Sequence, residues 1–330
     1  MQIVRKNLPC DKRANSLDVQ TLCVRIAASW GFLHQPLLSS LSFVSFWEHY
    51  GYSRLAFMRQ YAKVFCMKNI GNLMPDVVRI VRVAGDIAMR YYVLDDIGLE
   101  HKSDNSPITL ADKEIDAFLK QELLALCPDF GWLSEETVDD KVRLQKEAVW
   151  VVDPIDGTAE FVNKNAEFAI SVALCVDGKP VLGVVFAPAK NDIIYGGVGL
   201  GVQRNDELTH LPNLPKKNCD VELLTSRSET KKGLWQPFDG VFKQRVVGSC
   251  AYKMALLAAG DGYAMATLQP KHLWDMAAGH ALCLAAGLRV TDMQEQDIFY
   301  HQEIVTIDRG LISPFDFYDS FKQEIFSRLG

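Results

Sequence analysis

The chain lacks the sequence features of secreted, membrane-spanning and nucleic-acid-binding proteins. Its eight cysteines are scattered over 330 residues without a C-x-x-C pair, which favours reduced thiols and a cytoplasmic location. The apolar stretch at residues 37–47 is too short to cross a bilayer and lies too far along for an ordinary signal peptide, so we predict no membrane anchor. The net charge of −6 argues against a nucleic acid polymer as partner. Peripheral membrane association stays open.

The composition is that of a globular protein without repeats or low-complexity tracts. With 48% hydrophobic and 23% charged residues, 330 residues can bury an ordinary core in one large or two modest domains. Composition therefore sets the class of the protein, and the chemistry has to be read from local motifs.

Two carboxylates follow an apolar run at residues 150–158, the most informative segment of the chain. β-Branched and aromatic residues predict a buried strand over residues 149–152. Pro154 has no N–H group for a strand ladder, so we expect the chain to leave the sheet there. Asp153 and Asp156 would then lie together at the end of a strand.

Gly157 and Thr158 complete a turn that suits a phosphate group and a metal ion. Glycine lets a ligand approach the backbone closely, and a short helix that begins at Thr158 would present free N–H groups to an anion. The carboxylates of Asp153 and Asp156 are hard oxygen ligands, which suit Mg²⁺ together with phosphate oxygens. The alternative is a surface turn, because Asp-Pro and Asp-Gly pairs are common in turns.

A third acidic position lies at the start of a predicted helix. The polar loop at residues 102–112 contains Thr109, a good N-cap, before an amphipathic run over residues 113–126. Asp112 falls in the first turn, where a carboxylate is favourable beside the helix dipole whatever its function. A purely structural role for Asp112 is therefore an open alternative.

Two more segments carry acids. Residues 131–136 predict a short strand that ends in Glu135 and Glu136, for which a solvated acidic pair is the alternative; we expect Glu136 to be solvated. Residues 271–280 place Asp275 at the start of a helix whose small residues allow close packing, and a simple capping role is the alternative there.

These motifs, in this order and spacing, resemble the inositol monophosphatase and fructose-1,6-bisphosphatase superfamily of metal-dependent phosphatases. The matching segments read K-x-D-N-S-P-x-T-x-A-D, L-S-E-E, D-P-I-D-G-T-x-E-F and W-D-x-A-A-G. The resemblance is closest to the CysQ-type 3′(2′),5′-bisphosphate nucleotidases and runs from residue 67 to residue 300. It implies an α+β or α/β fold, a layered α-β-α-β-α sandwich of the sugar-phosphatase type.

The resemblance also implies a site for two or three Mg²⁺ ions. Glu135, Asp153 and the backbone carbonyl of Ile155 would hold the ion that activates water, and Asp153, Asp156 and Asp275 would hold a second ion on the leaving-group side. Inhibition by Li⁺ and Ca²⁺ is expected from the resemblance alone.

Catalytic roles follow from the same resemblance. Thr158 would orient the attacking water, Asp112 would accept the proton of the Thr158 hydroxyl, and Glu135 would share the role of base. The backbone amides of Gly157 and Thr158 would hold the phosphate group.

Substrate contacts are predicted from residues 249–260, which resemble the S-S-L-K-x-x-L-x-A-x-G segment of the nucleotidases. This assigns Ser249 and Lys253 to substrate binding, with Lys253 meeting a second phosphate; a lysine whose stem covers apolar surface is the alternative. Two departures put nucleotide specificity in doubt. Ala159 stands where the group usually has lysine, and residues 265–270 lack the usual Arg and Gly before the W-D motif.

We therefore predict a Mg²⁺-dependent phosphomonoester hydrolase, a 3′(2′),5′-bisphosphate nucleotidase that converts adenosine 3′,5′-bisphosphate to AMP and phosphate. The alternatives are an inositol monophosphatase or other small sugar-phosphate phosphatase and, more remotely, a non-catalytic binder of phosphate metabolites. The partner would be a small phosphorylated metabolite, and the chain would be a monomer or a homodimer.

The chain divides into three predicted parts. Residues 1–66 match no part of the superfamily pattern, and we expect an extension of poor order that begins at an upstream start codon. Residues 67–211 would form an N-terminal α+β half with most metal ligands, and residues 212–330 a C-terminal α/β half with Asp275 and substrate contacts. The expected elements are helices at 73–94, 113–126, 252–260 and 276–286, strands at 193–196, 221–225 and 245–247, and a hairpin of residues 169–176 and 181–187.

Overall fold

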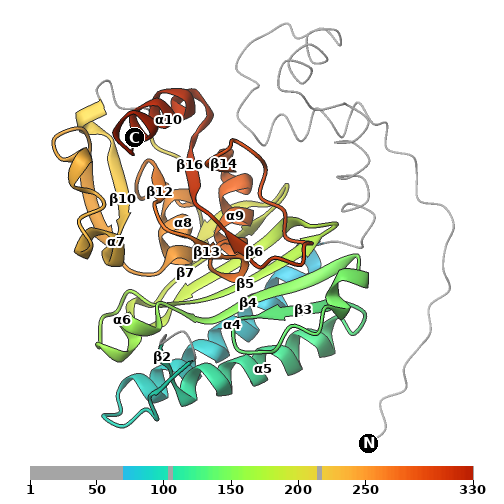
Figure 1. Ribbon diagram of the computed structural model, residues 1–330. Coiled ribbons are helices and arrows are strands. Elements are labelled where there is room, and N and C mark those ends of the chain that lie inside the picture. Colours follow the sequence, from blue (N-terminus) through green and yellow to red (C-terminus); the bar gives the residue numbers. More distant parts are fainter. Residues whose placement is uncertain (1–69, 103–106, 214–217, 330) are drawn as a thin grey trace, which may run out of the picture.

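The computed structural model describes residues 70–102, 107–213 and 218–329 and arranges them in alternating layers of helices and sheets (Figure 1). The layers are a helix pair, a seven-stranded sheet, a second helix pair, a region of smaller sheets and an outer helix layer. This is the α-β-α-β-α sandwich that the resemblance implies. The predicted extension at residues 1–66 lies outside the described residues.

The first layer consists of α4 (Ile70–Tyr92) and α5 (Leu110–Leu126), which pack on one face of the large sheet. Thr109 caps α5, and the Asp112 carboxylate accepts a hydrogen bond from the Thr109 N–H in return. The short strands β1 (Glu100–His101) and β2 (Pro107–Ile108) pair in the connection between the helices. The apolar residues that recur at helical spacing along α4 are all buried: Val77, Ile80, Val81, Ala84, Ile87 and Ala88.

The large sheet has the strand order β3-β4-β5-β6-β7-β8-β9, with β3 parallel to β4 and antiparallel pairing elsewhere. The predicted hairpin is present, and its turn at Asp177-Gly178 has positive φ angles of 46° and 74°, which suit the twist of the flanking strands. The strands are β3 (Gly131–Ser134), β4 (Ala148–Asp156), β5 (Ala169–Val176), β6 (Lys179–Ala187), β7 (Asp192–Gly197), β8 (Gly201–Arg204) and β9 (Glu207–Leu208).

The predicted exit from the sheet at Pro154 is wrong. Strand β4 continues to Asp156, which pairs with Ala169 of β5. The register shifts between Asp153 and Asp156, so the missing N–H group of Pro154 falls in an irregular part of the ladder, where proline is tolerated. The short helix α6 (Thr158–Val162) begins directly after this strand, as predicted.

Helices α8 (Cys250–Ala258) and α9 (Leu273–Ala286) form the middle layer and cover the other face of the large sheet. Successive side chains of a strand point to opposite faces, so β4 contributes to two cores. Trp150 and Val152 pack with the first helix pair, whereas Val149 and Val151 pack with α8 and α9. Residues from the two predicted halves of the chain therefore share one hydrophobic core.

The smaller sheets lie on the far side of α8 and α9, with the outer helices beyond them (Figure 1). Strands β10 (Glu222–Ser226) and β11 (Lys243–Val247) are parallel, and an antiparallel sheet has the order β12 (Met265–Thr267), β16 (Gly310–Pro314), β14 (Leu288–Asp292). The remaining elements are the pair β13 (Lys271–His272) and β15 (Thr306–Ile307), helices α7 (Arg227–Lys231) and α10 (Phe315–Leu329), and short 3₁₀ turns at Val142–Gln145, Pro188–Lys190, Asn218–Asp220 and Gln236–Phe238.

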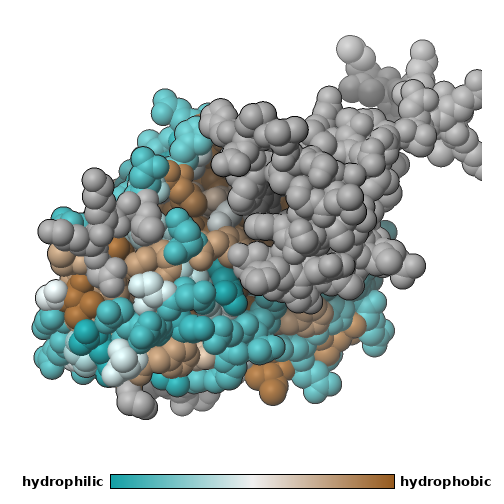
Figure 2. Space-filling view, turned by 90° about the horizontal axis from the view of Figure 1, so that it is seen from above, coloured by the Kyte–Doolittle hydropathy of each residue, from teal (hydrophilic) through white to brown (hydrophobic). Residues whose placement is uncertain are grey.

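The visible described surface is mostly hydrophilic, with hydrophobic residues scattered over it (Figure 2). Exposed large apolar side chains such as Val93, Val138, Leu208 and Ile304 come from separate parts of the chain. Within the described ranges, no helix combines the length and apolar character needed to cross a bilayer.

The contact between β6 and α9 leaves no room for a side chain at Gly183. A Cβ atom there would lie 2.3 Å from the carbonyl oxygen of Ala278. We expect Gly183→Ala to lower the free energy of unfolding by about 1 to 3 kcal/mol, because backbone in a packed layer cannot move aside cheaply. Urea unfolding would measure the loss. The control is Gly71→Ala, where the nearest atom is 3.4 Å away, and an equal loss in both variants would contradict the packing argument.

His280 of α9 makes stability depend on pH. Its ring is 4% exposed, its Nδ1 lies 3.0 Å from the Tyr300 hydroxyl, and burial lowers the pKa of His280 from 6.5 to about 3. The unfolded chain therefore binds the extra proton below pH 6.5, and stability falls as the pH drops. Between pH 7.5 and 5, the wild type should lose about 2 kcal/mol more than His280→Gln. Parallel losses of unfolding free energy in the two proteins would contradict this.

Candidate active site

Three acids from two distant parts of the chain meet where β4 ends and α9 begins. Asp153, Asp156 and Asp275, here called the acidic cluster, each offer a carboxylate oxygen, and these oxygens all lie within 4.8 Å of one another. Asp153 continues the face of β4 that carries Val149 and Val151, which is the face covered by α9. Asp275 lies in the first turn of that helix. The alternation along the strand thus directs Asp153 toward Asp275.

Hydrogen bonds from the backbone fix each carboxylate of the acidic cluster. The Ile155 N–H donates to Asp153 over 3.0 Å, and the His272 N–H donates to Asp275 over 3.0 Å. Capping is therefore a real part of the role of Asp275, which forms a capping box with His272. These bonds hold the acids in place before any ligand arrives.

Asp156 also joins the two predicted halves of the chain. Its carboxylate accepts hydrogen bonds of 2.5 Å from the Ser249 hydroxyl and from the Ala251 N–H at the start of α8. Ser249 is the N-cap of α8 and has a φ of 53°, a left-handed value that serine rarely adopts. The predicted substrate residue Ser249 thus contacts a predicted metal ligand directly.

Burial and mutual repulsion raise the pKa values of the acidic cluster. Burial raises the pKa of Asp153 well above its usual range, and the charges of Glu135 and Asp156 raise it further. Burial and then the charge of Asp156 raise the pKa of Asp275 to about 7. For Asp156, burial also raises the pKa, although the bonds from Ser249 and Ala251 oppose the shift. Ionising all three acids is costly without a positive charge among their oxygens.

Glu135 lies close enough to raise the pKa of Asp153 but stands outside the acidic cluster. Lys102 Nζ donates to Glu135 and to Glu136, both at 2.7 Å. The prediction that Glu136 is solvated is wrong, since its side chain is 5% exposed and burial raises its pKa to about 7. The sequence did contain a signal for Lys102, which opens the K-x-D-N motif.

Thr158 and Asp112 lie side by side next to the acidic cluster. The Thr158 hydroxyl is 3.5 Å from Asp112 Oδ1 and 3.2 Å from the Ile155 carbonyl oxygen. Asp112 is 1% exposed, and its other oxygen accepts bonds from the Thr109 N–H and hydroxyl. Burial raises the pKa of Asp112 to about 6, even though the bonds from Thr109 lower it. The structural role of Asp112 as a cap and its contact with Thr158 are both present.

The turn after β4 depends on Gly157. This residue has a φ of 95°, in the left-handed region that favours glycine, and it precedes the first residue of α6. A Cβ atom there would lie 3.3 Å from the Glu160 carboxylate and 3.4 Å from the Glu167 carbonyl oxygen. Gly157 and Thr158 are both half-buried, as a turn that lines a site should be.

Lys253 points away from solvent. Its side chain is 3% exposed, and its Nζ donates to the Ser249 carbonyl at 2.7 Å and the Val247 carbonyl at 3.4 Å. The ammonium does not reach water as a snorkelling lysine would. The positive charge of Lys253 lowers the pKa of Asp156 and so stabilises the ionised form of that carboxylate. Direct binding of substrate by Lys253 stays a prediction.

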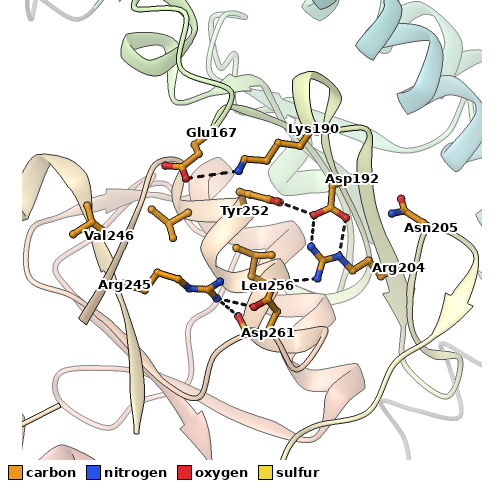
Figure 3. A pocket seen from close by; sticks show the side chains of 11 residues that line it. Glu167, Lys190, Asp192, Arg204, Asn205, Arg245, Val246, Tyr252, Leu256 and Asp261 are labelled. Carbon is orange, nitrogen blue, oxygen red and sulfur yellow. Dashed lines mark hydrogen bonds and ion pairs between the residues drawn. The ribbon is translucent and has the colours of Figure 1, made fainter. Parts of the chain in front are cut away.

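A charged cavity of about 580 Å³ lies beside the site, between β7, β8, β11 and α8 (Figure 3). Glu167 connects the two, because it lines the cavity and also accepts a 2.9 Å hydrogen bond from the Gly248 N–H just before α8. The cavity charges are paired with one another: Arg204 with Asp192 at 2.7 Å and Asp261 at 3.1 Å, Arg245 with Asp261 at 2.9 Å, and Lys190 with Glu167 at 3.8 Å.

Comparison with known proteins agrees with this geometry. The chain matches the Inositol monophosphatase family over residues 74–317. It is 34% identical to the 3′(2′),5′-bisphosphate nucleotidase CysQ of Escherichia coli strain K12, over 69% of this chain and 94% of that protein. Among solved structures, an IMPase of Thermotoga maritima is 25% identical with a TM-score of 0.69, covering 78% of this chain and 98% of that one. CysQ of Bacteroides thetaiotaomicron is 26% identical with a TM-score of 0.60, covering 74% and 97%.

The family match spans residues 74–317 and therefore includes all three acids of the acidic cluster. The chain therefore belongs to the inositol monophosphatase family of metal-dependent phosphatases.

Proposed function

We propose that this protein is a Mg²⁺-dependent phosphatase that hydrolyses 3′(2′),5′-bisphosphate nucleotides, with adenosine 3′,5′-bisphosphate as the preferred substrate. The observation that carries the proposal is the acidic cluster, in which three carboxylate oxygens lie within 4.8 Å of one another, with Asp153 and Asp156 buried and Asp275 half-buried. The identity of 34% to the CysQ nucleotidase favours this substrate over inositol phosphates.

The residues present fit a divalent metal ion. Their donors are carboxylate and carbonyl oxygens, the ligands that Mg²⁺ prefers, and like charges this close and this buried call for a cation between them. When bound, Mg²⁺ would supply positive charge for the reacting phosphate and lower the pKa of a nearby water. The proposed ligands are Glu135, Asp153, the carbonyl of Ile155, Asp156 and Asp275, for two or three ions.

Three residues would handle the attacking water and its proton. The Thr158 hydroxyl would orient the water, and Asp112, 3.5 Å away, would accept the Thr158 proton in exchange. The pKa of Asp112, raised by burial to about 6, keeps its carboxylate close to the range of an effective base. Glu135 would share the role of base once Lys102 releases it. The amides of Gly157 and Thr158 would hold the phosphate group.

An inositol or other small sugar phosphate is the second candidate substrate, and the replacement of the usual lysine by Ala159 favours it, because Ala159 adds no charge beside the phosphate turn. The contact between Thr158 and Asp112 disfavours the non-catalytic alternative, because binding alone does not require a proton acceptor beside the Thr158 hydroxyl. Inhibition by Li⁺ and Ca²⁺, a cytoplasmic location and a monomeric or homodimeric state all stay predictions.

Asp153→Asn tests the metal site. Asn keeps an acceptor for the Ile155 N–H but removes a buried carboxyl group whose pKa is raised because its ionised form is unfavourable there. Without metal, the variant should therefore be more stable than the wild type by about 0.5 to 2 kcal/mol. Mg²⁺ should raise the Tm of the wild type but not that of the variant. The rate of phosphate release by the variant should be at least about a hundredfold lower. Thermal melts with Mg²⁺ and with EDTA measure this.

The control for that variant is Asp129→Asn, which removes the same charge from an exposed position. It should keep the wild-type response to Mg²⁺. A response of wild-type size in Asp153→Asn would contradict the assignment of Asp153 as a metal ligand.

A substrate panel tests the proposed specificity. Phosphate release from adenosine 3′,5′-bisphosphate, inositol 1-phosphate and fructose 1,6-bisphosphate with Mg²⁺ should rank the nucleotide first by kcat/KM, because only a nucleotidase site is expected to bind both of its phosphates productively. A higher kcat/KM for inositol 1-phosphate would favour the second candidate. No release from any of the three would favour the non-catalytic alternative.

A further inference from the structure

Most cations around the site already have partners. Lys102 bonds to Glu135 and Glu136, and Lys253 is buried against two carbonyl oxygens. Arg227 forms an ion pair with Glu167, and the cations of the neighbouring cavity pair with acids in the same cavity (Figure 3). Each of these positive charges is therefore compensated by the protein itself.

Lys271 is different. It is half-buried, and among the described residues no hydrogen bond or ion pair engages its ammonium group. Lys271 and His272 form β13, so their side chains point to opposite sides of the strand. His272 is exposed and stacks on Trp274 with ring centroids 4.7 Å apart, which leaves the inner side of the strand to Lys271.

The backbone around Lys271 is held firmly. Strand β13 pairs with β15, with Lys271 opposite Ile307. Just before the strand, the buried carboxylate of Glu229 accepts bonds from the N–H groups of Leu268 at 3.0 Å and Gln269 at 3.1 Å. Just after it, the His272 N–H is bonded to Asp275. The backbone of Lys271 is therefore held in place next to the acidic cluster.

Its place in β13 brings the Lys271 side chain close to the acidic cluster, because the N–H of the next residue, His272, bonds to the Asp275 carboxylate. Burial lowers the pKa of Lys271, but the nearby groups Cys250, Asp275, Glu229 and Asp156 more than offset this effect and raise it. A positive charge there opposes the binding of metal cations. It would favour a ligand that brings more negative charge than the metal ions alone can neutralise.

We propose that Lys271 is a specificity residue that binds a second anionic group of the substrate, such as the 5′-phosphate of a 3′,5′-bisphosphate nucleotide. This inference rests on the proposed function and refines it, because it moves the second-phosphate contact from Lys253 to Lys271. Lys271 follows residues 265–270, which lack the Arg and Gly usual in nucleotidases, so it supplies a cation to the same loop from a different position.

The test compares kcat/KM for adenosine 3′,5′-bisphosphate and for adenosine 3′-monophosphate, which lacks the second phosphate. In Lys271→Met, the ratio of the two values should fall about ten- to a hundredfold, the usual effect of losing a hydrogen bond to a charged group. Lys271→Arg should restore most of the ratio because it restores the charge. Any change in metal affinity affects both substrates and cancels in the ratio.

The matched control is Lys232→Met, which removes an exposed lysine that bonds to Gln269 on the same loop at 2.9 Å. Its ratio should equal that of the wild type. Lys271→Gln serves as a second variant, and melting curves confirm that each protein is folded. An unchanged ratio in Lys271→Met and in Lys271→Gln would overturn the role of Lys271 while leaving the nucleotidase function intact. A wild type that does not prefer the bisphosphate would overturn both.

Discussion

The structure depends on the burial of carboxylates that repel one another. Asp153, Asp156 and Asp275 lie within reach of a single cation, and burial raises the pKa of each. Folding brings these charges together only because the protein surrounds them with hydrogen bonds from backbone N–H groups and one hydroxyl. The acidic cluster thus lowers the stability of the metal-free protein, and the binding of a divalent cation would offset this loss.

The same constraint explains the layered architecture. A strand buried on both faces can direct one set of side chains to each helix layer, and β4 does so while its end carries two acids. Asp275 can reach them only because α9 packs flat on the large sheet, where Gly183 allows its backbone to come close. Asp156 then links the start of α8 to the end of β4. The site therefore lies at the end of a strand that two hydrophobic cores share.

Charge balance around the site separates residues with different roles. Lys102 and Lys253 stabilise acids of the protein itself. Lys102 donates a hydrogen bond to Glu135, and the charge of Lys253 lowers the pKa of Asp156. Lys271 has no such partner in the described part of the chain, which makes it the cation most available to a ligand. Lys253 and Lys271 thus differ in their surroundings, because backbone carbonyl oxygens accept hydrogen bonds from the Lys253 ammonium.

The sequence by itself determined the local elements and the chemistry of the acids. The β-branched run before Asp153, the cap at Thr109 and the Asp-Gly hairpin signal act over a few residues, so they could be read directly. Only the tertiary structure decided that β4 continues past Pro154, that Glu136 is buried against Lys102 and that Lys253 faces carbonyl oxygens. These outcomes depend on contacts between residues far apart in the chain, and no local pattern encodes which partner will be there.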